Sequence, residues 1–156
     1  MSTSYGKKFE IKFKEDFCKL KNSFLLRLPD QVSGWKGSNN ICDFIGYINP
    51  HIFLLEVKTI TGNTFPLANF SQLSKLQQFK DIPGLRRGVV IWYTQRDAVI
   101  YVPVTTIEKM IADGKKSVNI RTIESEGYNY VKIPSVKKRV FLDSDYSVLC
   151  NLPEEW

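Results

Sequence analysis

A pair of apolar segments joined by a short turn constrains the fold of this chain more than any other feature. Residues 41–47 (ICDFIGY) and 52–59 (IFLLEVKT) are rich in β-branched and aromatic side chains, which favour strands. The intervening Asn49-Pro50-His51 is short enough for an antiparallel hairpin. We therefore expect a β-hairpin with one face in the core of the domain.

Charged side chains interrupt both strands of this hairpin. Side chains alternate across a strand, so Glu56 and Lys58 share one face and Val57 points to the other. Asp43 is an acid among apolar neighbours in the first strand, and across the hairpin it can meet Glu56. Two opposed carboxylates repel each other, so the pair requires a cation nearby.

A divalent metal ion would suit this carboxylate pair. Mg²⁺ takes oxygen ligands from one or two carboxylates together with water and phosphate. Lys58 could stabilise negative charge on a phosphate or help to deprotonate the attacking water. These residue types together indicate phosphodiester hydrolysis. Two plain alternatives stay open: a structural ion pair between Asp43 and Lys58, or a surface pair between Glu56 and Lys58.

The remaining pattern alternates helices and strands. Phe9, Phe13, Phe17 and Leu20 recur every three or four positions and predict a helix over 6–21. The patterns elsewhere predict strands at 24–28, 87–94 and 98–104 and a polar loop at 30–40. They also predict one helix from 71 to 82 and another from Thr105 or Thr106 to Ala112. Thr105 could cap the second of these helices, and Gly114 follows its end. We expect one α/β domain over 1–156, in which 116–156 is an irregular C-terminal extension with strand-like fragments and the basic run Lys137-Lys138-Arg139.

Composition narrows the class of protein. The 156 residues are 43% hydrophobic and 24% charged, which supports a packed core and excludes a disordered chain. A net charge of +6 fits a polyanionic partner such as nucleic acid or an anionic membrane surface. No apolar run is long enough to span a bilayer and no secretory leader is expected. Three scattered cysteines and the single His51 cannot complete a zinc site and suggest a reducing cytoplasm.

Several segments in order resemble one nuclease family. Asp43 followed by Glu56-Val57-Lys58 resembles the PD-(D/E)XK nuclease signature, with Cys42 in place of the proline before the acid. Residues 6–10 (GKKFE) resemble the GxxxE opening of RecU-type Holliday junction resolvases, and residues 65–70 (FPLANF) resemble their FPLxNF segment. Residues 88–103 also resemble phage-encoded members, so that the likeness covers roughly residues 5–116.

The resemblance implies a restriction-endonuclease-like fold, in which helices flank a central mixed β-sheet. It also implies a homodimer that cuts four-way DNA junctions symmetrically with Mg²⁺ or Mn²⁺. Carried over by residue, Asp43, Glu56 and the backbone carbonyl of Val57 would be metal ligands, Glu10 would complete the acidic set, and Lys58 would be the catalytic lysine. Gln72 is the candidate for a family glutamine, although Leu73-Ser74 stand where relatives read His-Gln. The plain alternatives are a surface pair of Glu10 with Lys14, and a polar residue at a helix start for Gln72.

The resemblance also implies that loop 30–40 occupies the place where resolvases of this group contact DNA. The candidates for DNA contact are Lys7, Lys8, Arg27, Lys36, Asn39, Asn40 and Thr59, and a solvated surface is the alternative for each.

Our hypothesis is a metal-dependent, structure-selective DNA endonuclease that resolves Holliday junctions. The alternatives are a related nicking or repair nuclease, a non-catalytic DNA-binding protein on the same fold, and a basic protein-interaction module. We expect a cytoplasmic location, in the bacterial host if the protein is phage-encoded.

Overall fold

Helices and short strands alternate along the chain in the computed structural model, which describes residues 2–29 and 40–156. In chain order the elements are α1 (Ser2–Phe17), β1 (Ser23–Arg27), β2 (Phe44–Ile48), β3 (His51–Ile60), β4 (Thr64–Pro66), η1 (Leu67–Asn69), α2 (Leu73–Gln77), β5 (Leu85–Tyr93), η2 (Thr94–Arg96), β6 (Ala98–Pro103), α3 (Val104–Ala112), β7 (Ser117–Asn119), β8 (Val131–Ile133), β9 (Ser135–Lys137), β10 (Leu142–Ser144) and η3 (Tyr146–Asn151).

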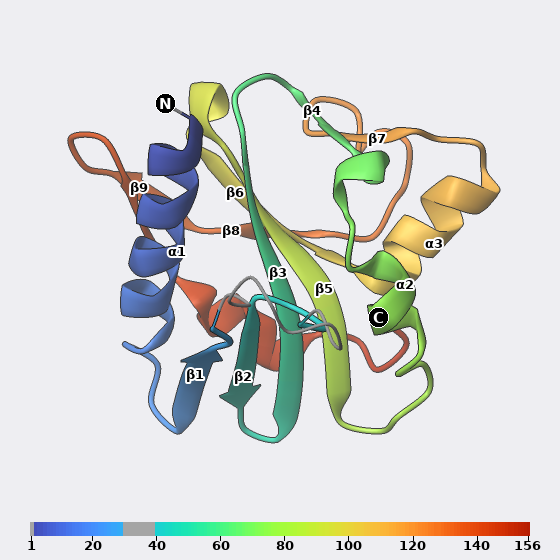
Figure 1. Ribbon diagram of the computed structural model, residues 1–156, viewed down its shortest axis with the longest axis horizontal. Helices are drawn as coiled ribbons and strands as arrows, with labels where there is room; N and C mark the ends of the chain where they lie inside the picture. Colours follow the sequence, from blue (N-terminus) through green and yellow to red (C-terminus); the bar gives the residue numbers. More distant parts are fainter. Residues whose placement is uncertain (1, 30–39) are drawn as a thin grey trace, which may run out of the picture.

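A six-stranded mixed sheet with the order β1-β2-β3-β5-β6-β8 forms the centre (Figure 1). Strands β3 and β5 are parallel, and the other neighbours in the sheet are antiparallel. Helices flank the sheet, as the resemblance implied. No helix in the described part of the chain is long and apolar enough to cross a membrane.

The predicted hairpin is confirmed, and its two strands differ in length. The pairing of β2 with β3 runs from Ile48 opposite His51 to Phe44 opposite Leu55. Strand β2 begins later than predicted, at Phe44, whereas β3 continues to Ile60 while paired with β5. Beyond Leu55, the edge of β3 that faces β2 is therefore not paired with any strand among the described residues.

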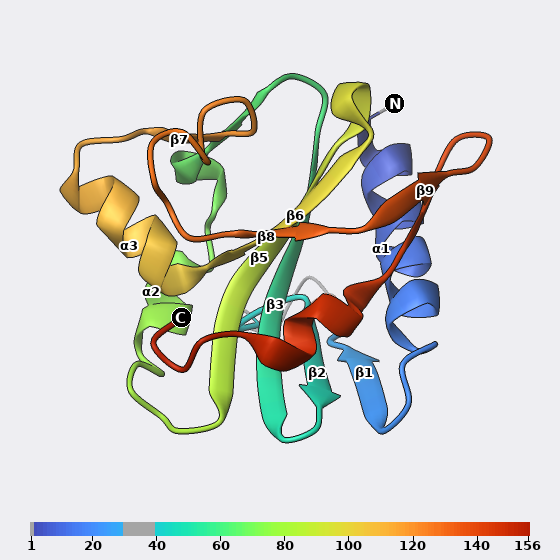
Figure 2. The same ribbon diagram turned by 180° about the vertical axis from the view of Figure 1, so that it is seen from behind.

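Helix α1 and the C-terminal segment cover one face of the sheet (Figure 2). Phe9, Phe13 and Phe17 are buried against this face, so the predicted apolar stripe is confirmed. The helix occupies residues 2–17 and not 6–21, because the chain turns after Phe17 and reaches a left-handed conformation at Asn22 (φ 55°).

Helices α2 and α3 pack on the opposite face. Helix α2 is shorter than the predicted 71–82, because the chain continues after Gln77 in turns whose hydrogen bonds span three residues. Helix α3 ends as predicted, with Gly114 at a φ of 79°. Thr105 is not its N-cap, since the helix begins directly after Pro103 and no side chain caps it.

The segment after residue 116 is more regular than expected. It holds four strands of three residues each, which are too short to show a period in the sequence. One of them, β8, extends the central sheet beside β6, and Leu142, Tyr146 and Leu149 are buried in the core beneath α1. This part of the chain therefore completes the core on the α1 side.

Two buried charged residues tie the C-terminal segment to the rest. The Asp16 carboxylate accepts hydrogen bonds from the Ser144 backbone N–H (3.0 Å) and from Lys12 (2.8 Å). The Arg86 guanidinium donates to the carbonyls of Leu152 (3.1 Å) and Pro153 (2.6 Å). Both side chains are almost fully buried, so these bonds fix the segment against α1 and β5.

The close approach of Gly88 and Tyr101 yields a test of the fold. A Cβ built at Gly88 would lie 2.3 Å from the ring of Tyr101, which is 1% exposed and donates from its hydroxyl to the Arg87 carbonyl. We expect Gly88→Ala to lower the free energy of unfolding by about 1–3 kcal/mol, as overpacked cores do. Thermal or denaturant unfolding measures this. Gly62→Ala is the matched control, since a Cβ there meets no described atom within 4 Å; equal effects of the two substitutions would contradict the prediction.

Candidate active site

Three hydrogen bonds hold Asp43 at the end of the hairpin. Its N–H donates to the Leu55 carbonyl (3.1 Å), and its carbonyl accepts from the Leu28 N–H (2.9 Å). Its carboxylate Oδ2 accepts from the Val57 N–H (2.9 Å), on the side of β3 that β2 leaves open. Asp43 is thus fixed between β1 and β3, where continuation of the hairpin register places it beside Glu56.

Glu56 carries a buried carboxylate with one unsatisfied oxygen. The residue is 2% exposed, and its Oε1 accepts from Lys58 Nζ at 2.9 Å. Its Oε2 is buried without a hydrogen-bond partner among the described residues. Because a buried charged oxygen without a partner is costly, this atom marks a place suited to a bound cation.

The charges of the site act on one another. Burial raises the pKa of Glu56, and the neighbouring Asp43 raises it further, while Lys58 opposes both. Burial alone would lower the pKa of Lys58, but Glu56, with Asp43 and Glu10, outweighs burial and leaves the pKa above its ordinary value. Lys58 is therefore held in its protonated, positively charged form at neutral pH.

Glu10 lies near these residues but has another partner. Its Oε2 accepts from Arg27 Nε at 2.8 Å, across the gap between α1 and β1. In residues 2–29 and 40–156 no three His, Cys, Asp or Glu side chains gather closely enough to hold a metal ion. The structure thus brings together Asp43, Glu56 and Lys58. Glu10 lies beside them but is paired with Arg27, a residue that the sequence analysis expected to contact DNA.

Cys42 replaces the proline of the nuclease signature. It is 1% exposed, and its Sγ donates to the Phe44 carbonyl at 3.1 Å. Burial, the largest cause, raises the pKa of this thiol to about 12. Cys42 is therefore a small packing residue beneath the site and not a nucleophile.

Gln72 lies at the start of α2, on the sheet face that also carries Leu54 and Glu56. It is the half-buried N-cap residue of the helix, and its side chain makes no capping bond. Its carbonyl accepts from the N–H groups of Lys75 and Leu76, both at 3.1 Å. Gln72 is therefore a polar residue at the helix start, as the plain alternative has it, and its side chain makes no capping bond there.

The residues expected to contact DNA are dispersed around the same end of the sheet. Lys7 and Lys8 are exposed on α1. Thr59 lies on β3 beyond the end of β2, and Asn40 donates to the Pro29 carbonyl at 2.6 Å. The two remaining candidates, Lys36 and Asn39, lie outside the described residues.

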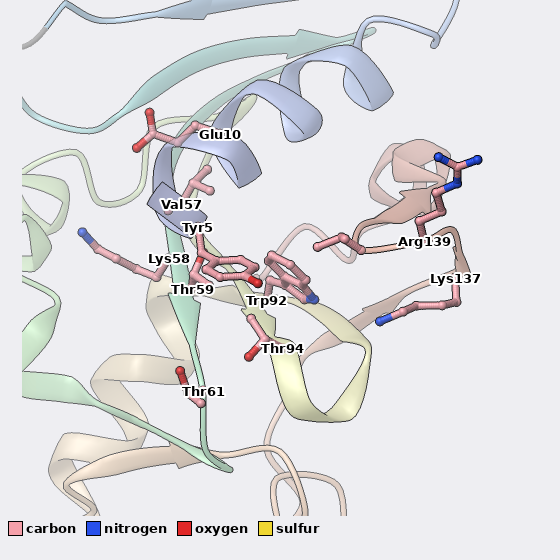
Figure 3. A pocket seen from close by; sticks show the side chains of 12 residues that line it. Tyr5, Glu10, Val57, Lys58, Thr59, Thr61, Trp92, Thr94, Lys137 and Arg139 are labelled. Atoms are coloured by element: carbon pink, nitrogen blue, oxygen red, sulfur yellow. The ribbon is translucent and has the colours of Figure 1, made fainter. Parts of the chain in front are cut away.

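A hollow next to Lys58 contains residues that sequence reasoning did not connect to the site. Tyr5 from α1, Trp92 from β5 and Arg139 from the C-terminal segment line it together with Glu10 and Lys58 (Figure 3). The segment Lys137-Lys138-Arg139 was visible in the sequence as a basic run. Its position beside β3 depends on the folding of the β9–β10 hairpin and could not be read from the sequence.

Comparison with known families identifies the chain. The family model for Recombination protein U, RecU, matches residues 29–142. The chain belongs to the RecU family. This confirms the resemblance seen in the sequence to RecU-type Holliday junction resolvases, whereas a phage origin stays a prediction. No curated protein matches the chain.

A solved structure shows the same fold. Hjc, a Holliday junction resolvase from the archaeal hyperthermophile Archaeoglobus fulgidus, superposes with a TM-score of 0.55 at 20% sequence identity. The match covers 77% of this chain and 93% of Hjc. The predicted restriction-endonuclease-like fold is thereby confirmed, including its mixed sheet between helices.

The raised pKa of Glu56 predicts how stability depends on pH. The folded protein holds the Glu56 proton more tightly than the unfolded chain does, so this stabilisation is complete below the unfolded pKa and is lost as pH rises through the folded pKa. In the presence of a chelator, the stability of wild type relative to Glu56→Gln should therefore fall as the pH rises above the ordinary glutamate pKa of 4.5. Denaturant unfolding at a series of pH values measures this difference.

Glu15→Gln, on the exposed side of α1, is the matched control for the loss of a carboxylate. The prediction is wrong if the difference in free energy of unfolding between wild type and Glu56→Gln stays constant with pH. It is also wrong if that difference equals the one for the control, because the raised pKa of Glu56 would then have no effect on stability.

Proposed function

We propose that this RecU-family protein is a metal-dependent, structure-selective DNA endonuclease that resolves four-way junctions by paired symmetric cleavage of phosphodiester bonds. One observation carries the proposal: Glu56 is buried beside Asp43, one of its oxygens has no partner among the described residues, and Lys58 is bonded to the other. This arrangement is costly for the fold and useful for binding a cation and a phosphate.

The donor set fits a divalent ion. Asp43 and Glu56 would hold it through carboxylate oxygens, which Mg²⁺ and Mn²⁺ both accept. The N–H and C=O groups of one strand residue point to the same neighbour, and the Val57 N–H already points to Asp43. The Val57 carbonyl is therefore available on the same open edge, and Glu10 can join if it leaves Arg27. Such an ion supplies neutralisation of phosphate charge and a lower pKa for water.

The side chains of this chain have distinct tasks in the proposed reaction. Lys58, whose raised pKa keeps it protonated, places a positive charge against the scissile phosphate. This favours its role in charge stabilisation over a role as a general base. Gln72 at the start of α2 is proposed to orient the attacking water. The residues proposed to contact DNA phosphates are Lys7, Lys8, Arg27, Lys36, Asn39, Asn40 and Thr59.

Two other functions would use the same parts. A nicking or repair nuclease differs only in its DNA substrate, and parallel digestion of a four-way junction, a flap and a plain duplex distinguishes it. A non-catalytic DNA-binding protein would bind without cutting in Mg²⁺ or Mn²⁺, and a protein-interaction module would not bind DNA. The proposed place of action is the cytoplasm, that of a bacterial host if the gene is phage-borne.

Substitutions of the central residues test the proposal. With a labelled immobile four-way junction, wild type should produce paired cuts in Mg²⁺ or Mn²⁺ and none in a chelator. Asp43→Asn and Lys58→Ala should each reduce cleavage by about 10²–10⁴-fold, because the first weakens the binding of the ion and the second removes a positive charge that acts on the phosphate. Junction binding, measured by gel shift without metal, should persist.

Lys116→Ala, an exposed lysine distant in sequence and outside the proposed site, is the matched control and should cut at the wild-type rate. Cleavage by Asp43→Asn or Lys58→Ala at that same rate would show that the site is assigned incorrectly.

Paired cuts require two active sites, and an exposed apolar patch among the described residues supports a homodimer. Phe24 (52% exposed) and Leu26 (54% exposed) lie on the face of β1 opposite α1, and Phe24 stacks on Tyr47 with ring centroids 5.9 Å apart. Ile52, also exposed, continues the patch on β3. Helices α2 and α3 cover this face farther along the sheet, and no described helix covers it at β1. We propose this patch as the contact between two copies.

A charge in the patch should separate the copies. Wild type is expected to sediment at twice the 18.0 kDa chain mass, and Leu26→Glu at the chain mass, because a buried unpaired charge disfavours an interface. Ile111→Glu, at a 47% exposed position on α3, is the control and should remain dimeric. A Leu26→Glu protein of undiminished mass would exclude this interface.

A further inference from the structure

The hollow beside Lys58 has the size of a small-molecule site. Its volume is about 670 Å³, within the range of ordinary ligand pockets and too small for a stacked duplex. Thr59 and Trp92, from the neighbouring strands β3 and β5, form its floor. Tyr5 of α1 and Arg139 of the β9–β10 hairpin form its walls (Figure 3).

Two polar atoms on the floor lack partners. Trp92 is 2% exposed, and its indole Nε1 has no hydrogen-bond partner among the described residues. Figure 3 shows this nitrogen on the edge of the ring that faces Lys137. The Thr59 hydroxyl is likewise buried and unpartnered within the described chain. A buried donor left unpaired is costly, so both atoms favour a ligand that offers hydrogen-bond acceptors.

An exposed aromatic ring stands at the mouth of the hollow. Tyr5 is 48% exposed, and its ring centroid lies 6.4 Å from that of Trp92. Aromatic faces of this kind stack DNA bases without regard to base identity. The hollow therefore offers a flat apolar surface at its entrance and donors at its floor, a combination that suits a nucleobase.

An exposed cation at the rim completes the set. Lys137 is paired with Asp97, whereas no carboxylate in the described residues lies within ion-pair distance of Arg139. The hairpin that carries Arg139 is anchored, since Lys12 pairs with Asp143 at 2.6 Å and the Phe141 ring lies 5.5 Å from that of Trp92. The backbone at Arg139 is thus held near the rim, and its exposed guanidinium, which points outward in Figure 3, can bind a phosphate there.

We infer that this hollow binds a single unpaired nucleotide of the DNA substrate, with its base stacked on Tyr5 and its phosphate at Arg139. The inference rests on the proposed function only in that DNA is the ligand. Branch points supply bases at little cost, because a base that is already unpaired need not be removed from a stack. Lys58 borders the same end of β3, although its side chain points away from Tyr5 and Trp92 (Figure 3).

The test compares two duplexes of equal length, one fully paired and one with a single unpaired thymidine, with full-length protein and a chelator so that no strand is cut. Wild type should bind the bulged duplex about tenfold more tightly, the contribution of one stacked base. Tyr5→Ala and Arg139→Ala should lose most of this preference. Tyr5→Phe, which keeps the ring, and Arg121→Ala, an exposed arginine outside the hollow, should retain it.

A crosslink locates the base directly. With 5-iodouracil at the unpaired position, irradiation should attach the DNA to the peptide that contains Tyr5 or Trp92. Attachment elsewhere, or an equal affinity of wild type for the two duplexes, would overturn the inference.

The junction-cleavage assay separates this inference from the proposed function. If the protein cuts junctions and its Tyr5→Ala and Arg139→Ala variants keep the full preference for the bulge, the hollow does not bind the unpaired nucleotide and the proposed nuclease function stands. If the protein cuts no junction but prefers the bulge in a way that depends on Tyr5, nucleotide binding in the hollow is supported and the proposed resolvase function is refuted.

Discussion

Repulsion between two carboxylates, imposed by a β-hairpin, is the constraint on which the rest of this structure depends. The backbone and side-chain bonds of Asp43 place it beside Glu56, and Glu56 is too buried for water to separate their charges. Lys58 relieves only one of the two Glu56 oxygens. A fold tolerates such an arrangement when the surrounding sheet is well packed, and Leu55 and Val57 on the other side of β3 belong to the core cluster beneath α1.

Because β3 is longer than β2, the two carboxylates lie at an open strand edge and form an accessible site. The pairing with β2 ends at Leu55, opposite Phe44, whereas β3 stays paired with β5 as far as Ile60. The end of β3 therefore presents backbone groups on an open edge. Glu56 and Lys58 reach this edge from the face of α2 and α3, and Glu10 approaches it from the face of α1. The C-terminal hairpin adds Arg139 beside the same strand end. A single strand end thus collects groups from both faces of the sheet.

Sequence reasoning succeeded where the pattern was local. The hairpin, the phenylalanine stripe of α1 and the end of α3 at Gly114 depend on neighbouring residues, and each was predicted. The three-residue strands after residue 116 were missed, because such short elements are specified by their partners and not by a period. The pairing of Glu10 with Arg27 was missed for a similar reason, since these residues lie on different elements.

The sequence by itself determined that an acidic pair and a lysine would meet on one hairpin, because side-chain alternation and a short turn leave few other registers. It also determined the family, through motifs whose order is specific. Only the tertiary structure decided which acid stays unsatisfied, how firmly Lys58 keeps its proton, and which distant cations lie beside the site. Those properties depend on burial and on contacts between residues far apart in the chain, which no local pattern encodes.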